Sequence, residues 1–466
     1  MKCANNKHQI AGEGLALPQN NKGGREVFKI SDNATKAINM LKNAGYEAYI
    51  VGGCVRDMVM GIDAHDYDVT TSALPSETKE VFKDERTIET GLKHGTLTVV
   101  LNGEALEITT YRIDGEYLDN RHPQSVSFTR NLQQDLSRRD FTMNALVYND
   151  KEGVLDYFGG QDDIENRVIR AIGNPEKRFQ EDALRILRGI RFSSVLGFSI
   201  EENTKKAMIR CKHLLHNISP ERIAVEINKF VLGRYVKNAI LENYEILGEI
   251  CPEFLRMHGF EQHNKWHIYD VLEHTAVAVE NTPPVLPLRL AMLFHDTGKV
   301  HTFSTDEKGV GHFYGHGEKS AEIVREYLNK YKYDNYTKGE VYQLVKIHDL
   351  PTEADEVLVK KRLNRIGKER FLNLLKIQRA DKLAQNPEIA KTDYLDILEK
   401  MADEIINQSC FDLSTLKING TDLIENGFEK GKRIGEILNE LLSEVIDNKL
   451  KNEKNELLQR AREMKR

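Results

Sequence analysis

The sequence predicts an α+β fold in which a small mixed head precedes a series of helical domains. Three observations support this prediction. Strand-like runs occur only before about residue 160. Two of these runs are joined by Asn102-Gly103, the strongest short-range hairpin signal. From Ile164 onward, apolar residues follow helical spacing almost throughout the 466-residue chain.

The head is expected to begin with a helix over Val27–Asn43, which Ser31 or Asp32 would cap. A second helix is predicted over Thr78–Phe82. Strands are predicted at Glu47–Val51, Asp66–Thr70, Thr96–Leu101 and Ala105–Thr110.

Among the later helices, Glu181–Phe192 has the clearest apolar side. Three prolines between Asn281 and Pro287 separate one helical stretch from the next. The segment after about Ile418 is interrupted by glycines and then becomes charged and helical.

Composition is typical of a soluble globular protein, since 40% of the residues are hydrophobic and 30% are charged. No apolar run approaches the ~20 residues of a membrane span, and the N-terminus lacks an apolar signal core. The five scattered cysteines form no C-x-x-C pair. We therefore expect a cytoplasmic protein without disulfides or a membrane partner. The net charge of -6 means that an RNA partner would have to be held by local basic patches.

Residues 51–68, VGGCVRDMVMGIDAHDYD, carry the first chemical motif. The two glycines let the backbone approach phosphate oxygens, which Arg56 can neutralise by a fork contact. In a strand, Asp66 and Asp68 would point the same way and could hold Mg²⁺ against a triphosphate. An isolated D-x-D is more often a pair of surface acids, but the glycines and the arginine upstream favour nucleotidyl transfer.

Further polar groups follow this motif. Glu107, on the second strand of the predicted hairpin, is a candidate for a third metal-binding carboxylate.

Residues 111–123, YRIDGEYLDNRHP, are predicted to form a loop. Four side chains of this loop can touch a nucleotide: Tyr111, Arg112, Tyr117 and Arg121. The segment RRDFTMN, residues 138–144, offers cations for phosphate or ribose and an amide for a hydroxyl. Taken alone, residues 111–123 also fit an exposed polar loop, and residues 138–144 also fit the capped start of a helix.

Residues 181–192, EDALRILRGIRF, form the most specific predicted helix. Asp182 and Arg185 are three residues apart and would share one helical face. A carboxylate and a guanidinium together offer the acceptors and donors that the Watson–Crick edges of C and A require. Arg188 and Arg191 continue the spacing and can hold phosphates. The alternative is a set of surface ion pairs, each contributing a few tenths of a kcal/mol.

Together these motifs resemble the class II tRNA nucleotidyltransferases, the bacterial CCA-adding enzymes and poly(A) polymerases of the polymerase β-like superfamily. GGCVRD and DYD resemble the catalytic motif, RRDFTMNA the ribose-selecting motif and EDALRILRGIRF the protein-templating motif, in the family's order. INGTDLIENGFEKGKRIGEIL resembles the family's tRNA-binding tail. The resemblance implies five segments: a flexible extension (1–26), a nucleotidyltransferase head (27–163), a helical neck with the templating helix (164–232), a helical body with an HD metal site (233–400) and a helical tRNA-binding tail (401–466).

The resemblance also implies an enzyme that extends the 3′ end of tRNA with CTP and ATP, without a nucleic-acid template, and releases pyrophosphate. Asp66 and Asp68 would be the catalytic residues that bind Mg²⁺. Nucleotide contacts are implied at Gly53, Arg56, Arg139, Asp140, Asn144, Asp182, Arg185, Arg188 and Arg191.

The family has CCA-, CC- and A-adding branches, and its CC-adding members lack an intact loop between the first two motifs. In this sequence residues 111–123 resemble an intact loop, so an enzyme that incorporates A is expected. We prefer full CCA addition, with an A-adding enzyme or a poly(A) polymerase as the alternative. Bacterial poly(A) polymerases usually have a more basic C-terminus than this chain.

A second set of metal-binding side chains lies in the helical region. His295-Asp296, within HDTGK, resembles the signature of the HD metal-dependent phosphohydrolases. The implied ligands are His274, His295, Asp296 and Asp381, with His316 and His348 extending the site to two metals and Lys299 binding phosphate. Imidazole and carboxylate ligands suit a transition metal such as Ni²⁺, Mn²⁺ or Fe²⁺ better than Mg²⁺ alone.

An intact HD site predicts an additional phosphohydrolase activity, whereas the alternative is a metal-bound helical domain that only supports the RNA. Two further hypotheses are an HD phosphohydrolase with an inactive transferase head and a non-enzymatic RNA-binding or chaperone protein. The complete carboxylate pair of the head argues against both.

Overall fold

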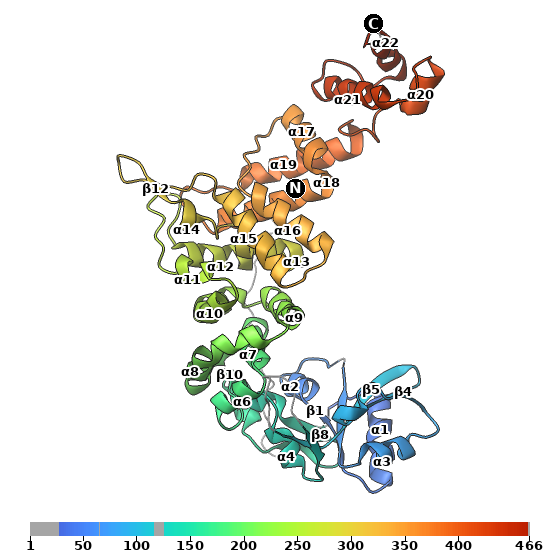
Figure 1. Ribbon diagram of the computed structural model, residues 1–466, viewed down its shortest axis with the longest axis vertical. Coiled ribbons are helices and arrows are strands. Elements are labelled where there is room, and N and C mark those ends of the chain that lie inside the picture. Colours follow the sequence, from blue (N-terminus) through green and yellow to red (C-terminus); the bar gives the residue numbers. More distant parts are fainter. Residues whose placement is uncertain (1–27, 65, 116–124, 465–466) are drawn as a thin grey trace, which may run out of the picture. The chain divides into compact units, whose positions relative to one another are not determined.

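The computed structural model describes residues 28–64, 66–115 and 125–464. The described residues form two compact units, one from residue 28 to Ser193 together with Gly197–Ile218, and one of Ser194–Leu196 together with residues 219–464. The first unit contains a sheet and the second is almost entirely helical (Figure 1). The predicted α+β class, with a mixed head before helical domains, is confirmed.

A seven-stranded sheet forms the centre of the first unit, in the order β3-β4-β5-β2-β1-β8-β9. Strands β2 and β5 are parallel, and the other neighbouring strands are antiparallel. The strands are β1 (Ala48–Val51), β2 (Asp68–Thr71), β3 (Arg86–Ile88), β4 (Thr96–Leu101), β5 (Glu104–Thr110), β8 (Leu146–Asn149) and β9 (Gly153–Asp156). Helices α1 (Asp32–Asn43) and α3 (Pro75–Val81) pack against one another and against these strands.

The other elements of the first unit flank this sheet or follow it in the chain. They are α2 (Gly53–Val59), β6 (Arg112–Asp114), β7 (Val126–Phe128), α4 (Leu132–Ser137), α5 (Gly160–Glu165), β10 (Val168–Ile169), α6 (Pro175–Glu181), α7 (Leu184–Leu196), β11 (Ser199–Ile200), α8 (Glu202–Cys211) and the 3₁₀ turns Leu92–His94, Thr142–Asn144 and Lys212–Asn217.

The hairpin at Asn102-Gly103 is confirmed. Both residues have positive φ, 50° and 86°, as the tight turn between β4 and β5 requires. Helix α1 starts later than predicted, because the Ser31 hydroxyl caps it by accepting a hydrogen bond from the amide of Ala34. Residues 28–31 are therefore not helical, and Val27 lies outside the described residues.

Three local predictions in the head are wrong. Strand β2 begins at Asp68, so Asp66 lies in the preceding loop and the two carboxylates do not share a strand face. Tyr111 is fully buried in a cluster with Tyr49 and Val147, so it cannot touch a nucleotide in this arrangement. Arg112 opens strand β6 rather than a loop, while residues 116–124, with Tyr117 and Arg121, lie outside the described residues.

The predicted helix over Glu181–Phe192 is interrupted. Helix α6 ends at Glu181, Asp182 is extended with φ −140° and ψ 103°, and α7 begins at Leu184. The Asp182 carboxylate accepts a hydrogen bond from the amide of Leu184 at 3.1 Å. A short polar side chain that bonds the nearby backbone competes with helix continuation, and this explains the break.

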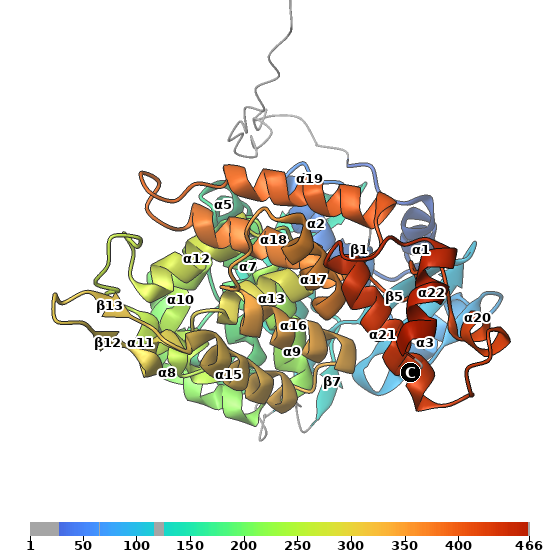
Figure 2. The same cartoon turned by 90° about the horizontal axis from the view of Figure 1, so that it is seen from above.

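Helices make up most of the second unit (Figures 1 and 2). Helix α12 packs against α10, α13 and α18, and α18 also packs against α17 and α19. Within the described residues, every helix is too short or too polar to cross a bilayer. The elements are α9 (Pro220–Val231), α10 (Val236–Ile250), α11 (Glu253–Met257), α12 (Val271–Asn281), α13 (Leu286–Phe294), α14 (Lys299–Thr302), β12 (Ser304–Thr305), β13 (Gly311–His312), α15 (His316–Lys330), α16 (Asn335–Ile347), α17 (Glu356–Ile366), α18 (Lys368–Leu383), α19 (Asp393–Gln408), α20 (Gly420–Glu425), α21 (Lys432–Ile446) and α22 (Lys454–Met464).

Candidate nucleotidyl-transfer and metal sites

The candidate transferase site lies where β2 and β5 run side by side. Asp68 is directly opposite Glu107 in the parallel register of these strands. Asp68 is exposed at the start of β2, but the surrounding chain partly desolvates its carboxyl, and this desolvation together with repulsion from Glu107 raises its pKa, although Arg139 opposes the shift. The sheet thus brings a second carboxylate beside Asp68, and Asp66 adds negative charge from the loop before β2.

The Gly52-Gly53 turn lies beside the arginine of the second motif. Gly52 has φ 87°, and a Cβ atom there would meet the Arg139 guanidinium at 3.2 Å. Burial lowers the pKa of Arg139, and its Nε has no hydrogen-bond partner among the described residues. The Arg139 guanidinium, next to the glycine turn and near Asp68, is suited to a phosphate group that bridges to a metal.

Asp140 connects three predicted nucleotide-binding residues. Its carboxylate accepts hydrogen bonds from the Asn144 amide at 3.1 Å and from Arg188 Nε at 2.7 Å. Asn144 in turn accepts a hydrogen bond from Arg56 at 2.8 Å. Burial raises the pKa of Asp140, but Arg188 and Asn144 outweigh it and lower the pKa to about 2. Asp140 therefore stays ionised at neutral pH. It fixes the positions of Asn144 and Arg188 through its hydrogen bonds.

Arg185 is held by three neighbours, two on α6 and one at the end of α4. It donates hydrogen bonds to the Glu181 carboxylate at 3.0 Å and to the carbonyl oxygens of Arg178 at 3.2 Å and Arg138 at 2.8 Å. Its predicted partner Asp182 lies in the break before α7 rather than on the same helical face. Glu181 was not singled out from the sequence, although its place beside Asp182 in the same motif was visible. Arg191 lies over the Phe192 ring at 4.2 Å.

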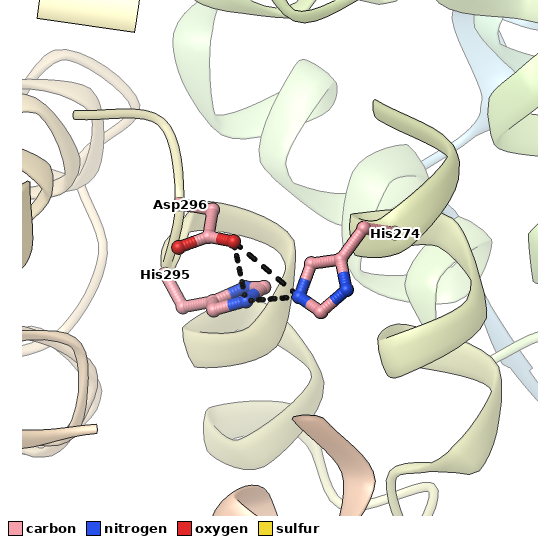
Figure 3. A group of neighbouring side chains, drawn as sticks. All are labelled: His274, His295 and Asp296. Atoms are coloured by element: carbon pink, nitrogen blue, oxygen red, sulfur yellow. Dashed lines mark hydrogen bonds and ion pairs between the residues drawn. The ribbon is translucent and has the colours of Figure 1, made fainter. Parts of the chain in front are cut away.

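The predicted HD ligands converge in the second unit. His274 on α12 and His295 after α13 bring their Nε2 atoms within 3.3 Å of one another. Oδ2 of Asp296 lies 3.4 Å from the first of these atoms and 3.1 Å from the second (Figure 3). Oδ1 of Asp381 on α18 lies 2.9 Å from His274 Nε2. Four ligand atoms from different segments therefore surround one point.

The other carboxylate oxygen of Asp296 faces a second pair of histidines. Oδ1 lies 3.6 Å from His316 Nε2 and 3.9 Å from His348 Nε2, and the two imidazole nitrogens are 3.1 Å apart. Both triads that include Asp296 have ligand atoms within 4.8 Å of one another. Asp296 thus lies between two ligand groups, as a bridging carboxylate of a two-metal site would.

The hydrogen bonds of the four histidines test whether this set fits a metal. In each, Nδ1 contacts a backbone carbonyl oxygen, those of Ala384, Met292, Phe313 and Val345. Such contacts place the proton on Nδ1 and leave a lone pair on Nε2. The Nε2 lone pairs then face one another and Asp296, whose buried oxygens have no well-formed hydrogen bond. Metal cations between these groups would relieve this arrangement, so the residues fit metal ions.

A cavity of about 580 Å³ opens onto this cluster. Lys299 lines it, lies 2.7 Å from Asp296 Oδ2 and donates a hydrogen bond to Gln262 at 2.8 Å. Sequence reasoning missed His267, which also lines the cavity. Its position seven residues before His274, in the same histidine-rich segment, was the available signal.

Three segments match known families. Residues 48–170 match the poly(A) polymerase head domain, residues 197–257 a probable RNA- and SrmB-binding site of polymerase A, and residues 302–461 a putative second domain of tRNA nucleotidyltransferase. The CCA-adding enzyme of Oceanobacillus iheyensis is 37% identical over 313 residues, which cover 67% of this chain and 70% of that protein. The chain belongs to the family of CCA-adding enzymes.

Other CCA-adding enzymes give shorter but closer matches. That of Geobacillus thermodenitrificans is 49% identical over 203 residues, which cover 44% of this chain and 50% of that enzyme. The similarity extends to structure over most of the chain. The crystal structure of Bacillus stearothermophilus CCA-adding enzyme in complex with CTP is 29% identical, with a TM-score of 0.70, and the match covers 93% of this chain and 96% of that one.

Proposed function

We propose that this chain adds the 3′-terminal CCA sequence to tRNA from CTP and ATP and releases pyrophosphate. The observation that supports this most directly is the pairing of Asp68 with Glu107 near the Arg139 guanidinium. The family of CCA-adding enzymes and the structural similarity to a member in complex with CTP agree with it.

Each part of the head has a role in this proposal. Asp68, with Asp66 and Glu107 nearby, provides the negative charge that holds divalent cations. Mg²⁺ bound there would lower the pKa of the RNA 3′-hydroxyl and neutralise the leaving pyrophosphate. Arg139 holds the triphosphate at the Gly52-Gly53 turn.

Base selection falls to Asp182 and Arg185, which flank the break between α6 and α7. Because the Arg185 guanidinium is bonded to Glu181 and to two carbonyl groups, its position is set before a nucleotide arrives. Arg188, fixed by Asp140, and Arg191 provide positive charge along the same helix.

The test is incorporation of labelled CTP and ATP into tRNA that lacks CCA. Asp68→Asn should abolish incorporation, whereas Asp63→Asn, an exposed carboxylate in the same loop region, should leave it unchanged. Incorporation by Asp68→Asn at the wild-type rate would overturn the proposal.

A second activity, metal-dependent hydrolysis of phosphoesters, is proposed for the second unit. The specific observation in its favour is Asp296, whose two oxygens face His274 and His295 on one side and His316 and His348 on the other. The chemistry of the donors suits Ni²⁺, Mn²⁺ or Fe²⁺, and such ions supply an activated water. Lys299 would hold the phosphoryl group.

Hydrolysis of p-nitrophenyl phosphate by protein loaded with each of these metals tests this activity. Asp296→Asn should abolish hydrolysis and leave CCA addition intact, because the two sites use different residues. Absence of hydrolysis with every metal would favour a role of the metals in stabilising the helical unit alone.

A further inference from the structure

Three arginines of the candidate nucleotide-binding motifs converge on one aromatic ring, that of Phe192. The guanidinium carbon of Arg191 lies 4.2 Å from the ring centroid, that of Arg56 5.2 Å and that of Arg188 5.6 Å. Each distance is within the ~6 Å at which a cation is attracted to an aromatic face. A single ring on α7 therefore contacts two cations of its own helix and one from a motif far away in the sequence.

The position of the Phe192 ring is set by the core of the first unit. The side chain is buried, and its ring meets the ring of Phe141 edge-on, with centroids 6.0 Å apart and planes at 89°. Phe141 is itself fully buried and belongs to the segment RRDFTMN. Arg188 precedes Phe192 by one helical turn, so the two side chains lie on the same face of α7. The ring is thus a fixed support on which the guanidinium groups lie.

The cluster of Phe192 and its three arginines extends to the Gly52-Gly53 turn. A Cβ atom at Gly53 would lie 3.6 Å from Nη2 of Arg56. The Arg56 guanidinium also donates hydrogen bonds to the Asp57 carboxylate at 2.9 Å and 2.7 Å. Phe192 therefore connects the arginines of α7 with the turn that is proposed to receive the triphosphate.

An aromatic ring can hold such cations without cancelling their charge. Guanidinium groups that lie close together repel one another. Asp57 and Asp140 each fix one of the three, Arg56 and Arg188, but a carboxylate also offsets the charge that an anionic ligand needs. An aromatic face attracts a guanidinium through its quadrupole, and the N–H groups stay in the guanidinium plane, where phosphate oxygens can reach them. The cluster is therefore suited to a polyanion such as a triphosphate.

We propose that Phe192 is a positioning residue of the nucleotidyl-transfer site, which holds Arg56, Arg188 and Arg191 by cation–π contacts so that they bind the triphosphate of the incoming nucleotide. This inference rests on the proposed addition of CCA to tRNA. Since CTP and ATP share the triphosphate, Phe192 acts on both nucleotides alike and does not select the base.

The test measures KM and kcat for CTP and for ATP with the full-length protein and tRNA that lacks CCA. Phe192→Leu replaces the ring by an aliphatic side chain. Replacement of Phe192 by pentafluorophenylalanine keeps the shape of the ring but reverses the polarity of its faces, whereas Phe192→Tyr keeps an electron-rich ring. The matched control is Phe198→Leu, which removes a buried ring just after α7 that is not part of the cluster.

The KM for both nucleotides should rise about tenfold in Phe192→Leu and in the fluorinated protein, as the loss of two or three cation–π contacts predicts. The kcat should change little, because the contacts hold the triphosphate equally before and during the reaction. Phe192→Tyr and Phe198→Leu should keep the wild-type KM. The fluorinated protein retains the packing of the ring, so it decides the question even if Phe192→Leu folds poorly.

A wild-type KM in the fluorinated protein would overturn the inference, because the ring would then act by its shape alone. A rise in KM for only one of the two nucleotides would also overturn it, because Phe192 would then act on the base. If the wild-type protein incorporated neither nucleotide, the proposed addition of CCA would fail and this inference with it. The two failures are distinguishable, since the first two outcomes require an active wild-type enzyme.

Discussion

Asp68 and Glu107 are directly opposed on the parallel strands β2 and β5, in the centre of the sheet of the first unit. Side chains at opposed positions of neighbouring strands lie on the same face of a sheet. Two carboxylates in this relationship repel one another unless a cation lies between them. We therefore predict that this pair binds a divalent cation.

The first prediction concerns the third carboxylate. Glu107→Gln should lower the rate of nucleotide incorporation by about tenfold or more, because it removes part of the charge that holds the metals. The required Mg²⁺ concentration should rise at the same time. Single-turnover kinetics over a range of Mg²⁺ concentrations measures both. An unchanged rate and an unchanged Mg²⁺ dependence would remove Glu107 from the site.

The second prediction follows from the raised pKa of Asp68. Since the folded state favours the neutral carboxyl, ionised Asp68 destabilises the fold at neutral pH, and the loss grows as the pH rises through its raised pKa. In EDTA, Asp68→Asn should therefore melt slightly higher than the wild type while being inactive. Thermal unfolding at pH 7 checks this. A lower melting temperature would show that ionised Asp68 instead stabilises the fold.

The third prediction concerns Asp140, whose pKa is shifted in the opposite direction to that of Asp68. Its pKa is lowered from 3.8 to about 2, so ionised Asp140 stabilises the fold above its unfolded pKa, and this is lost as the pH falls from about 4 to 2. The shift corresponds to about 2 kcal/mol at neutral pH. Asp140→Asn should lose this amount at pH 7 and differ less from the wild type at pH 3. Urea unfolding at both pH values measures the difference, and an equal loss at both would contradict the account.

The fourth prediction concerns Glu181, which anchors Arg185. Glu181→Gln should weaken that contact, raise the KM for CTP and ATP, and increase misincorporation of UTP and GTP, because the guanidinium is less well positioned. Glu202→Gln, which removes an exposed carboxylate paired with Lys206, is the matched control. Steady-state kinetics with all four nucleotides gives the comparison. Unchanged selectivity would mean that the two backbone carbonyls alone position Arg185.

The fifth prediction concerns metal removal from the second unit. Metal ions bound by His274, His295, Asp296 and Asp381 relieve the opposed lone pairs, so a chelator should lower the melting temperature. A metal present at 100 times its dissociation constant stabilises the fold by about 2.7 kcal/mol. Differential scanning calorimetry of metal-loaded and chelated protein measures this. Asp296→Ala, which removes the carboxylate shared by both ligand groups, should melt at the same temperature in both conditions.

Features set by short stretches of sequence were predictable. Asn102-Gly103 requires two positive φ angles, and the hairpin follows from that local chemistry. The candidate HD ligands could be named from the sequence because His295-Asp296 is a contiguous pair and the other candidates fall in matching motifs. The structure brings their atoms within reach of one another, which no spacing in the sequence could establish.

Features set by competition between local and distant contacts were not predictable. Asp182 fits a helical pattern, but its carboxylate bonds the amide of Leu184 and breaks the helix. The residues that follow Tyr111 are typical of a loop, yet Tyr111 itself is buried by residues from distant strands. His267, which lines the cavity beside the candidate HD ligands, was missed because it lies outside the motifs that mark those residues in the sequence.

Addition of CCA to tRNA is tested most directly with three tRNA substrates, which end before CCA, after the first C and after both C residues. Each is incubated with the purified protein, Mg²⁺ and labelled CTP, ATP or both, and the products are sized to one nucleotide. If the protein adds the complete CCA sequence, the shortest substrate is extended to CCA, with C added from CTP before A from ATP. Addition of a single A to the CC-ended substrate alone, or extension of none of the three, would contradict it.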